Sequence, residues 1–496
     1  MSSDSPTVPQ PIAHPNPQKP TVPLTLKTQI SYGIGEISSE ITGSVQVFYW
    51  LFFLTEVARL SPAQAGSVLL IARVWDAVLD PLVGWLSDHT ESRWGRRYPW
   101  MVVGAVPFGV SFALLLWAIP AAPPTWRWLW ASAIAVLFYT AFTIVMVPYT
   151  TLGAELTAEY DERTRLISTK AAFSIASSII ALIIAGIVFA LIEDDVLKYQ
   201  VVGGICGAIA TVSILICVWG TRERFDAVQK VRQRRVKPPQ MSIFKQLRTA
   251  ASNRPFLYIV GIYLCSWLGL QVTAAMLPYF VVEWMGRTEQ DFTQMALTFQ
   301  ITALVMMVFW RRLSVHLGKK AIYLWGIPLT LVAQLGFFAL QPGQTAFMYG
   351  LCVLAGMGLS AAYFVPWSML PDAVDFDELR TGKRREGIFS GLMIQIKKLA
   401  IAATIFFITE ALETSGFTTG NVGVATQPDS ALLMIRLLIA PIPAISLVVG
   451  LILAAAYPLS RSVHDEILLK LHDQRQAQDM DGGEAIGELK AAKSLE

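Results

Sequence analysis

The chain has 496 residues, of which 54% are hydrophobic and only 15% are charged. An ordinary soluble domain has about 25% charged residues, so this composition excludes a soluble globular protein of average make-up. The formal net charge of +3 gives no strong overall field and therefore no indication of a nucleic-acid partner. The mean hydropathy of +0.50 favours a chain that lies largely inside a membrane.

The first segment, residues 1–29, is rich in Pro and Ser, has no apolar core and so is not a signal peptide. We expect it to form a disordered cytoplasmic tail. Beyond it, apolar segments of about twenty residues recur, which is the length that crosses a bilayer as a helix. A hydropathy window of about nineteen residues predicts twelve spans. These cover 30–57, 63–87, 99–119, 128–154, 167–192, 199–220, 255–284, 291–313, 320–341, 345–370, 387–412 and 430–457.

The stretch between the sixth and seventh spans is too polar and too basic to cross a membrane. The sequence therefore predicts a first six-helix bundle over 30–220 and a second over 255–457, joined by a cytoplasmic connector at 221–254. Residues 458–496 are polar again, and we expect a cytoplasmic tail there.

Lys and Arg are concentrated in the even-numbered loops and the connector. Because positive residues in short loops stay on the cytoplasmic side, both ends of the chain are predicted to be cytoplasmic. The even-numbered loops hold Arg93, Arg96, Arg97, Arg163, Arg165, Arg311, Arg312, Lys319, Lys320, Arg380, Lys383, Arg384 and Arg385. The odd-numbered loops hold only Arg59, Arg127, Lys198 and Arg287.

The two halves of the chain also resemble each other. The fourth span ends in "VPYTTLGAEL" from Val147, and the tenth ends in "VPWSMLPDAV" from Val365. Likewise "LSDHTESRWGRR" after the second span is echoed by "LSVHLGKK" after the eighth. This repeat predicts an all-α membrane protein of twelve transmembrane helices, arranged as the two pseudo-symmetric six-helix halves of the major facilitator fold.

Charged residues at bilayer depth are costly, at about 2.5–3.5 kcal/mol each on insertion scales, and so mark candidate functional positions. Glu36 and Glu40 share one face of the first span, and Asp76 and Asp80 share one face of the second. Arg73 lies one turn before Asp76 and can pair with it. The other such residues are Lys170 in the fifth span and Lys397 with Lys398 in the eleventh.

The paired aspartates allow two interpretations. They could belong to a salt-bridge network that holds helices together. Two carboxylates, however, carry more negative charge than one arginine neutralises. Their hard oxygen ligands, beside a hydroxyl of Thr140 or Thr143, would suit a small cation or a proton. All five histidines fall in loops or tails, so carboxylates would have to carry any coupled proton.

Aromatic residues supply a second, less specific signal. Tyr149 and Trp367 each follow the proline of a repeated motif and could stack on a sugar ring. Aromatic residues at such positions also serve as packing or interface residues, and this alternative stays open. The four cysteines all lie in apolar segments and form no CxxC pair, which indicates packing residues.

At this point a family resemblance is evident. "RVWDAVLDPLVGWLSD" followed by "SRWGRRYPW" resembles the signature of the glycoside–pentoside–hexuronide:cation symporters, the family of the melibiose permease. "SYGIGEISSE", "VPYTTLGAEL" and "DAVDFDELRTGKRREGIFSG" are similar to further blocks of that family. The resemblance extends over residues 30–457.

The resemblance implies a cation site at Asp76, Asp80 and Thr143. It also implies a substrate site with Glu40 and Lys397, to which we add Arg73, Tyr149, Thr150 and Trp367 as candidates. Three positions depart from the family pattern. The family's arginine in the fifth span falls on or beside Ala171, with Lys170 as its nearest counterpart. Met146 stands where the sugar permease has a carboxylate that joins the two sites, and Thr150 stands where it has a stacking tryptophan.

We therefore expect a symporter that imports a sugar or glycoside together with Na⁺, Li⁺ or H⁺ by alternating access. The alternative is a sodium-dependent lysophospholipid transporter of the same superfamily branch, which also keeps paired aspartates and a "VPY" motif. We further expect a monomer with no cofactor beyond the coupling cation. The disordered cytoplasmic N-terminus suits a protein of the bacterial inner membrane. A membrane enzyme or receptor has no support, since the sequence shows no metal-ligand histidine cluster and no extramembrane catalytic domain.

Overall fold

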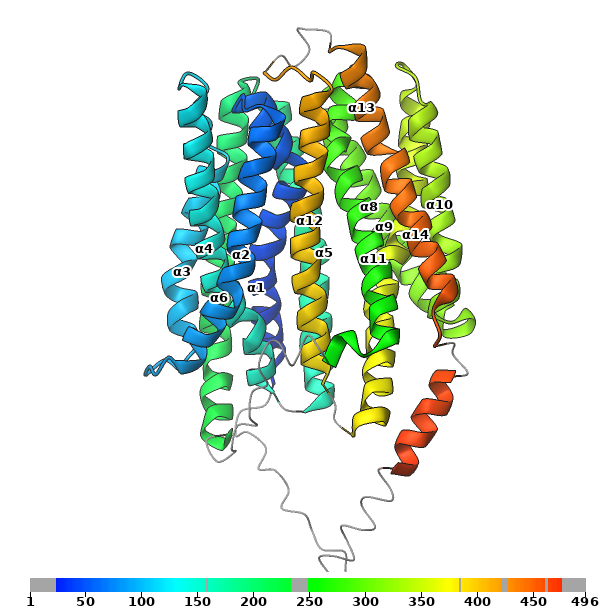
Figure 1. Ribbon diagram of the computed structural model, residues 1–496. Coiled ribbons are helices and arrows are strands. Elements are labelled where there is room, and N and C mark those ends of the chain that lie inside the picture. Colours follow the sequence, from blue (N-terminus) through cyan, green and yellow to red (C-terminus); the bar gives the residue numbers. More distant parts are fainter. Residues whose placement is uncertain are drawn as a thin grey trace, which may run out of the picture.

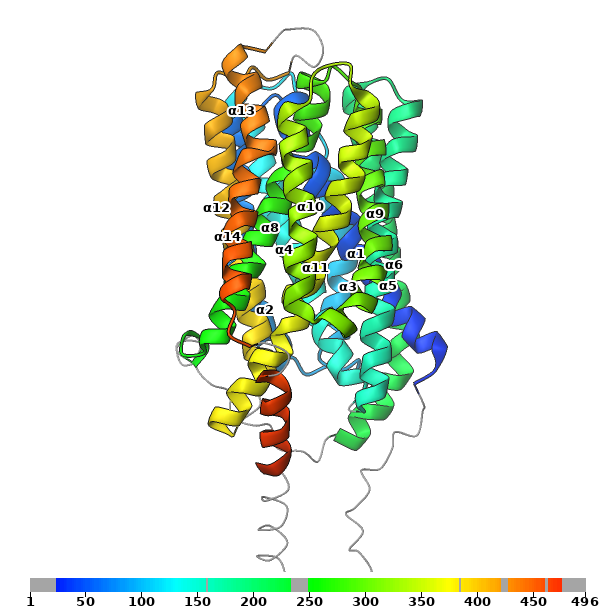
Figure 2. The same ribbon diagram turned by 90° about the vertical axis from the view of Figure 1, so that its right-hand side faces the viewer.

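The computed structural model describes residues 24–157, 159–232, 249–382, 385–420, 427–459 and 463–474. Most of the predicted first tail, the centre of the predicted connector and the last part of the predicted second tail lie outside these ranges. Figure 1 and Figure 2 show a bundle of long helices that run roughly parallel to one another.

Twelve helical rods correspond to the twelve predicted spans. The first six are α1 (Leu26–Val45) continued by the π-helical turns η1 (Gln46–Trp50) and η2 (Phe53–Val57), α2 (Pro62–His89), α3 (Tyr98–Leu115), α4 (Pro124–Leu156), α5 (Tyr160–Leu191) and α6 (Asp195–Arg232). The second six are α8 (Arg254–Tyr279) with η3 (Phe280–Trp284), α9 (Glu289–Leu317), α10 (Lys319–Ala339), α11 (Thr345–Thr381), α12 (Glu386–Thr414) and the pair α13 (Asp429–Ile439) with α14 (Pro441–Ala456).

Ten of these rods are long and apolar enough to cross a membrane on length and composition alone. The other two are α1 and α2, which carry the paired acidic residues and are correspondingly more polar. Both pack within the bundle, α1 against α5 and α6 and α2 against α4 and α12. The polar character of these two helices is therefore explained by what they face inside the bundle.

Two six-helix halves make up the bundle, one from α1 to α6 and the other from α8 to α14. The halves meet chiefly where α2 packs against α12, where α5 packs against α9, and where α8 packs against η1. The α2–α12 contact is close because Gly66 lies against Thr409, and a Cβ added to that glycine would come within 1.8 Å of Thr409 Oγ1. Small residues commonly permit such approach between membrane helices.

The pseudo-symmetry is clearest where the first helix of each half ends. α1 ends in a π-helical turn over Phe53–Val57, and α8 ends in one over Phe280–Trp284. Each is followed by a residue of positive φ, Arg59 at 55° and Gly286 at 61°. A capping box then starts the next helix in each half, from Ser61 for α2 and from Thr288 for α9. The repeat in the sequence thus has a matching repeat in backbone geometry.

One end of the bundle, which we call the far end, joins the two halves through polar contacts. Here the Tyr49 hydroxyl lies 2.8 Å from Thr293 Oγ1. The Thr55 hydroxyl lies 2.7 Å from the Tyr279 hydroxyl. An ion pair also joins α6 to α9, with Lys198 Nζ at 3.0 Å from Glu289 Oε1. At this end the halves are bound to each other.

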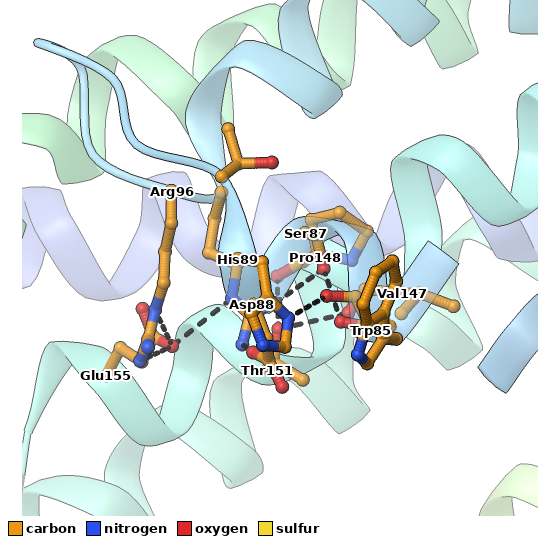
Figure 3. A network of polar contacts seen from close by, with 12 residues as sticks. Trp85, Ser87, Asp88, His89, Arg96, Val147, Pro148, Thr151 and Glu155 are labelled. Carbon is orange, nitrogen blue, oxygen red and sulfur yellow. Dashed lines mark hydrogen bonds and ion pairs between the residues drawn. The ribbon is translucent and has the colours of Figure 1, made fainter. Parts of the chain in front are cut away.

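The opposite end, which we call the basic end, carries the arginine- and lysine-rich loops. Arg96 binds Glu155 within the first half (Figure 3). Arg97 also binds Glu155, and it binds Ser87 and Asp88 of the same half. In the second half Lys319 binds Asp372 at 2.6 Å, and Arg385 lies 3.7 Å from Asp377. These ion pairs at the basic end each stabilise one half.

A further helix over 463–474 lies at the basic end, below α10, α11 and α14 (Figure 2). Its His464 lies 3.2 Å from Asp375 and 3.6 Å from Asp372, two carboxylates of α11. The hydrogen bond to Asp375 raises the pKa of His464 from its ordinary value of 6.5, and the charge of Asp372 adds to this effect, although burial and Lys319 oppose it. The contacts of His464 with these carboxylates therefore add to the buried Ile467 and Leu471 in holding this helix in place.

Candidate cation and substrate sites

The paired aspartates of α2 lie beside a lysine of α12. Lys398 Nζ lies 2.9 Å from Asp76 Oδ2 and 2.6 Å from Asp80 Oδ2. The side chains are 17% exposed for Lys398, 1% for Asp76 and 23% for Asp80, so the cluster is largely shielded from water. A single ammonium group thus bridges two carboxylates at the interface between the two halves.

Thr143 of α4 completes the cluster on the side of the first half. Its buried hydroxyl donates a hydrogen bond to Asp76 Oδ1 at 3.0 Å. The three residues that the family resemblance implies for a cation, Asp76, Asp80 and Thr143, are therefore brought to one place. Met146, which stands where a third carboxylate was expected, is buried, and its sulfur lies 3.7 Å from Ser38 Oγ.

The oxygen atoms of this cluster suit a small hard cation. Among the described residues, no group of three or more His, Cys, Asp or Glu side chains could hold a metal ion. Two carboxylates and one hydroxyl instead supply hard oxygen ligands and at most two negative charges, which favours a monovalent cation. The ammonium of Lys398 has the same charge as such a cation and lies between the same carboxylates.

A backbone carbonyl in the same turn of α2 is also engaged by α12. Pro81 lies inside α2 and has no N–H, so the carbonyl of Ala77 lacks its usual partner within the helix. Gln395 Nε2 donates a hydrogen bond to Ala77 O at 2.9 Å instead. Gln395 and Lys398 are one turn apart, so the same face of α12 contacts α2 twice.

Arg73 does not pair with Asp76, and that expectation was wrong. Among the described residues no ion pair joins them, and the Arg73 guanidinium lies 5.1 Å from the centre of the Tyr139 ring. The reason is that Lys398 supplies the positive charge beside Asp76. Arg73 is thereby left free of the aspartates.

Lys397 lies among aromatic side chains of the second half. Its ammonium is 4.2 Å from the centre of the Trp267 ring and 5.8 Å from that of Tyr263. Trp367 packs edge-on against Tyr263 at 5.8 Å and remains 38% exposed. Lys397 and Trp367, two of the predicted substrate residues, are thus linked through one aromatic cluster.

Glu40 of α1 faces this cluster from the first half. Its carboxylate lies close enough to Lys397 for the two charges to interact, and it lies beside the Ser174 hydroxyl of α5. The neighbouring acidic residue, Glu36, forms an ion pair with Lys170 at 3.3 Å. Glu40 and Lys397 therefore lie on opposite sides of the plane between the halves, as the two walls of a central site would.

The two remaining candidates lie apart from this cluster. Tyr149 is fully buried, stacks on Tyr32 with ring centres 5.2 Å apart, and donates its hydroxyl to Tyr32 O. Its ring thus packs between α1 and α4, and the ammonium of Lys170 lies 5.4 Å from the ring centre. Thr150 is exposed, and its hydroxyl is hydrogen-bonded to Val147 O of its own helix.

The sequence analysis gave a role to Lys397 and none to Lys398, and it missed Gln395 and Tyr263. Hydropathy cannot decide which of two consecutive lysines points to which neighbour, because that depends on how α12 is rotated. Pro81 was a usable signal, since a proline inside a span requires a donor from another helix for the freed carbonyl.

Comparisons with known proteins identify the family of the chain. Residues 31–461 match the family described as MFS/sugar transport protein. An uncharacterised symporter of Synechocystis sp. is 39% identical, with 91% of this chain and 98% of the relative covered. The sodium-dependent lysophosphatidylcholine symporter 1-A of Danio rerio is 26% identical, with 94% of this chain and 93% of the relative covered.

Solved structures share the fold. A bacterial homolog of the human lysosomal transporter Spinster, in an inward-facing and unoccupied conformation, superposes with a TM-score of 0.61 at 14% identity. The superposition covers 90% of this chain and 97% of that one. The fold, the family match and the related symporters together exclude an enzyme, and they make the protein an integral membrane transporter. The chain belongs to the MFS/sugar transport protein family and is a symporter of the major facilitator superfamily.

Proposed function

We propose that this symporter couples the transport of a small organic substrate to a monovalent cation, with Na⁺ as the first candidate and Li⁺ or H⁺ as alternatives. The observation that carries this proposal is the position of Lys398, whose ammonium bridges Asp76 and Asp80. A cation that binds these carboxylates must displace the lysine, so cation binding and the position of α12 are linked.

This linkage gives a route from the cation to the substrate. Lys397 is the next residue on α12 and lies in the aromatic cluster with Trp267. A shift of α12 that releases Lys398 therefore also moves Lys397, which faces Glu40 across the central plane. Coupling between two sites is typically worth about 1–3 kcal/mol, and the shared helix α12 carries it in this proposal.

A sugar or glycoside is our first choice of substrate. Sugar rings stack on aromatic side chains, and Trp367 is partly exposed in the cluster around Tyr263. The carboxylate of Glu40 can accept hydrogen bonds from sugar hydroxyls, and the ammonium of Lys397 can donate them. Arg73, which is not engaged by the aspartates, is a further donor at the central plane.

A lysophospholipid is the second candidate. The relative from Danio rerio is named for sodium-dependent transport of lysophosphatidylcholine. In this chain Arg73 and Lys397 each lie over an aromatic ring, and among the described residues neither forms an ion pair with a carboxylate. Two such cations suit a phosphate group, which arginine and lysine both bind.

We infer that the basic end faces the cytoplasm, in a bacterial inner membrane, and that the protein works as a monomer. In that orientation the far end is closed by Lys198 and Glu289 and by the tyrosine hydrogen bonds, so the conformation is inward-facing. The charged loops of the basic end would then exchange partners between the halves when that end closes.

The test is thermal unfolding of the purified full-length protein with a panel of glycosides and lysolipids, each with and without Na⁺. We expect Na⁺ to raise the Tm and to increase the shift given by the true substrate class. Asp76→Asn and Asp80→Asn should each remove the Na⁺ effect, while Glu410→Gln, a change to an exposed carboxylate of α12, should retain it. An undiminished Na⁺ effect in both aspartate variants would contradict the cation site.

A further inference from the structure

The carbonyl oxygen of Ala77 occupies an unusual position in α2. The helix continues through Pro81, whose ring nitrogen has no hydrogen to donate, so Ala77 O loses the bond that residue 81 would otherwise make. Within a membrane such a carbonyl needs a donor from elsewhere, because no water is present to bind it. Gln395 of α12 provides that donor at 2.9 Å.

This carbonyl lies in the same helical turn as the cation-site carboxylates. Ala77 directly follows Asp76, and Asp80 is three residues further on. Helical side chains lean toward the N-terminus, so the carboxylate of Asp80 leans back over the turn that contains the Ala77 peptide. The oxygen atoms of Asp76, Asp80 and Ala77 are therefore presented by one turn of one helix.

α12 occupies this whole set of oxygens at once. Lys398 places its ammonium on the two carboxylates, at 2.9 and 2.6 Å. One turn away on the same helix, Gln395 places an amide N–H on the carbonyl. Lys398 therefore neutralises the carboxylates and Gln395 satisfies the carbonyl. A bound cation would do both in their place.

We propose that the Ala77 carbonyl is a further ligand of the coupling cation, and that Gln395 occupies it when the cation is absent. The proposal rests on the cation site proposed above. Carbonyls freed from helical hydrogen bonding are known to coordinate Na⁺ in transporters built from interrupted helices. Here the carbonyl replaces the oxygen that Met146 cannot supply, so the cation is held by Asp76, Asp80, Thr143 and Ala77.

A purely structural role for Gln395 is the competing explanation, in which the amide only satisfies a carbonyl left by a proline. The two explanations differ in what happens when the carbonyl is capped from within its own helix. Pro81→Ala restores an N–H at residue 81, which can bond Ala77 O. If the carbonyl is a ligand, this change removes it from the cation site; if it is not, cation affinity is unaffected.

The experiment measures the apparent Kd of Na⁺ by a titration of the Tm of the purified full-length protein, with tryptophan fluorescence as a second readout. Pro81→Ala should weaken Na⁺ binding by about tenfold, the usual value of a charge-assisted contact. Gln395→Leu removes the competitor and should tighten Na⁺ binding a few-fold. Pro328→Ala, at an exposed proline inside α10, is the matched control and should leave the Kd unchanged.

The double variant decides between the explanations. In the Pro81→Ala background the carbonyl is already capped, so Gln395→Leu should no longer tighten Na⁺ binding, and the two effects should not add. Wild-type Na⁺ affinity in Pro81→Ala would overturn the proposal. If Pro81→Ala does not fold, unchanged or weaker Na⁺ binding by Gln395→Leu would overturn it. Absence of any Na⁺, Li⁺ or proton response in the unmodified protein would overturn the cation site itself, and this proposal with it.

Discussion

Lys397 and Lys398 are adjacent in the sequence and have different surroundings. Successive residues of an α-helix are separated by about 100° around the axis, since 3.6 residues make one turn. Lys398 consequently points to the aspartates of α2, while Lys397 points to Trp267 of α8. This rotation places one ammonium on the paired aspartates and the next one in the aromatic cluster, which is the arrangement that the proposed cation and substrate roles require.

We expect Lys398→Met to make the protein less stable without Na⁺ and more responsive to it. The change leaves two carboxylates without their partner, one of them fully buried, and removal of one member of a buried ion pair costs about 3–5 kcal/mol. Na⁺ should then restore more stability than in the unmodified protein. The measurement is the Tm of purified protein as a function of Na⁺ concentration.

Lys397→Met is the matched control for this prediction, because it removes the same charge from the neighbouring position of the same helix. It should leave the Na⁺ dependence of the Tm unchanged. Equal Na⁺ responses of Lys398→Met and the unmodified protein would contradict competition between the lysine and the cation.

The family resemblance led to Asp76, Asp80 and Thr143, and the structure brings Asp76 and Thr143 within hydrogen-bond distance. The family resemblance could not predict that Lys398 would lie between the aspartates, since that contact joins residues of α2 and α12 from different halves. Tyr149 is the opposite case, because a sequence motif pointed to it as a candidate substrate residue. The proline motif before it is real, yet its ring stacks on Tyr32 inside the first half.

At the scale of elements, hydropathy located the spans and underestimated the length of most of them, although α3 was predicted to reach residue 119 and ends at Leu115. α6 was predicted to end at residue 220 and continues to Arg232, and α11 was predicted to end at residue 370 and continues to Thr381. Hydropathy detects only the apolar part of a helix, whereas backbone hydrogen bonding continues into polar turns beyond the bilayer. The predicted last span also divides at Ala440, just before Pro441, into α13 and α14.

The repeat between the halves does not extend to the charges. At the positions in α9 that correspond to Arg73, Asp76 and Asp80 of α2, the chain has Gln300, Ala303 and Met307. Gln300 instead binds Ser178 of α5 at 2.7 Å, across the interface between the halves. The paired carboxylates thus belong to only one copy of the repeated element, whereas both copies contact the opposite half, α2 through α12 and α9 through α5.

The helix over 463–474 should detach from α11 as the pH rises. A group whose pKa is raised on folding contributes stability below its unfolded pKa of about 6.5, and this contribution is lost as the pH rises through the folded value. His464 is such a group, because Asp375 and Asp372 favour its charged form. Hydrogen exchange of residues 463–474 should therefore be slow in mildly acidic buffer and faster in mildly alkaline buffer.

His464→Gln should abolish this pH dependence and leave exchange fast throughout. His472 is the control on the same helix, since its side chain is 67% exposed, and His472→Gln should behave as the unmodified protein. Exchange that is independent of pH in the unmodified protein would contradict a role for His464 in docking.

For the molecule as a whole, the contacts between the halves along the α2–α12 interface become fewer from the far end to the basic end. Near the far end, Ala63 N donates to Glu413 Oε2 at 3.1 Å and Gly66 lies against Thr409. Near the middle are the contacts of Gln395 and Lys398. Toward the basic end, Cβ atoms added to Gly387 or Gly391 of α12 would meet nothing within 4 Å. The halves thus diverge toward the basic end.

This divergence predicts that the far-end ion pair controls which end is open. Glu289 binds Lys198 at 3.0 Å and the Tyr199 hydroxyl at 3.2 Å, so Glu289→Gln weakens a link between α9 and α6. Because charge-assisted contacts are worth about 1.5–3 kcal/mol, we expect the far end to open about tenfold more often.

The reporter is Thr293→Cys, which replaces a buried hydroxyl beside Tyr49 and should react faster with a membrane-impermeant maleimide when Glu289→Gln is added. Glu410→Gln, at an exposed carboxylate of α12, should not change the rate. Identical labelling rates with and without Glu289→Gln would contradict control by the ion pair and would leave the Thr55–Tyr279 hydrogen bond as the contact that keeps the far end closed.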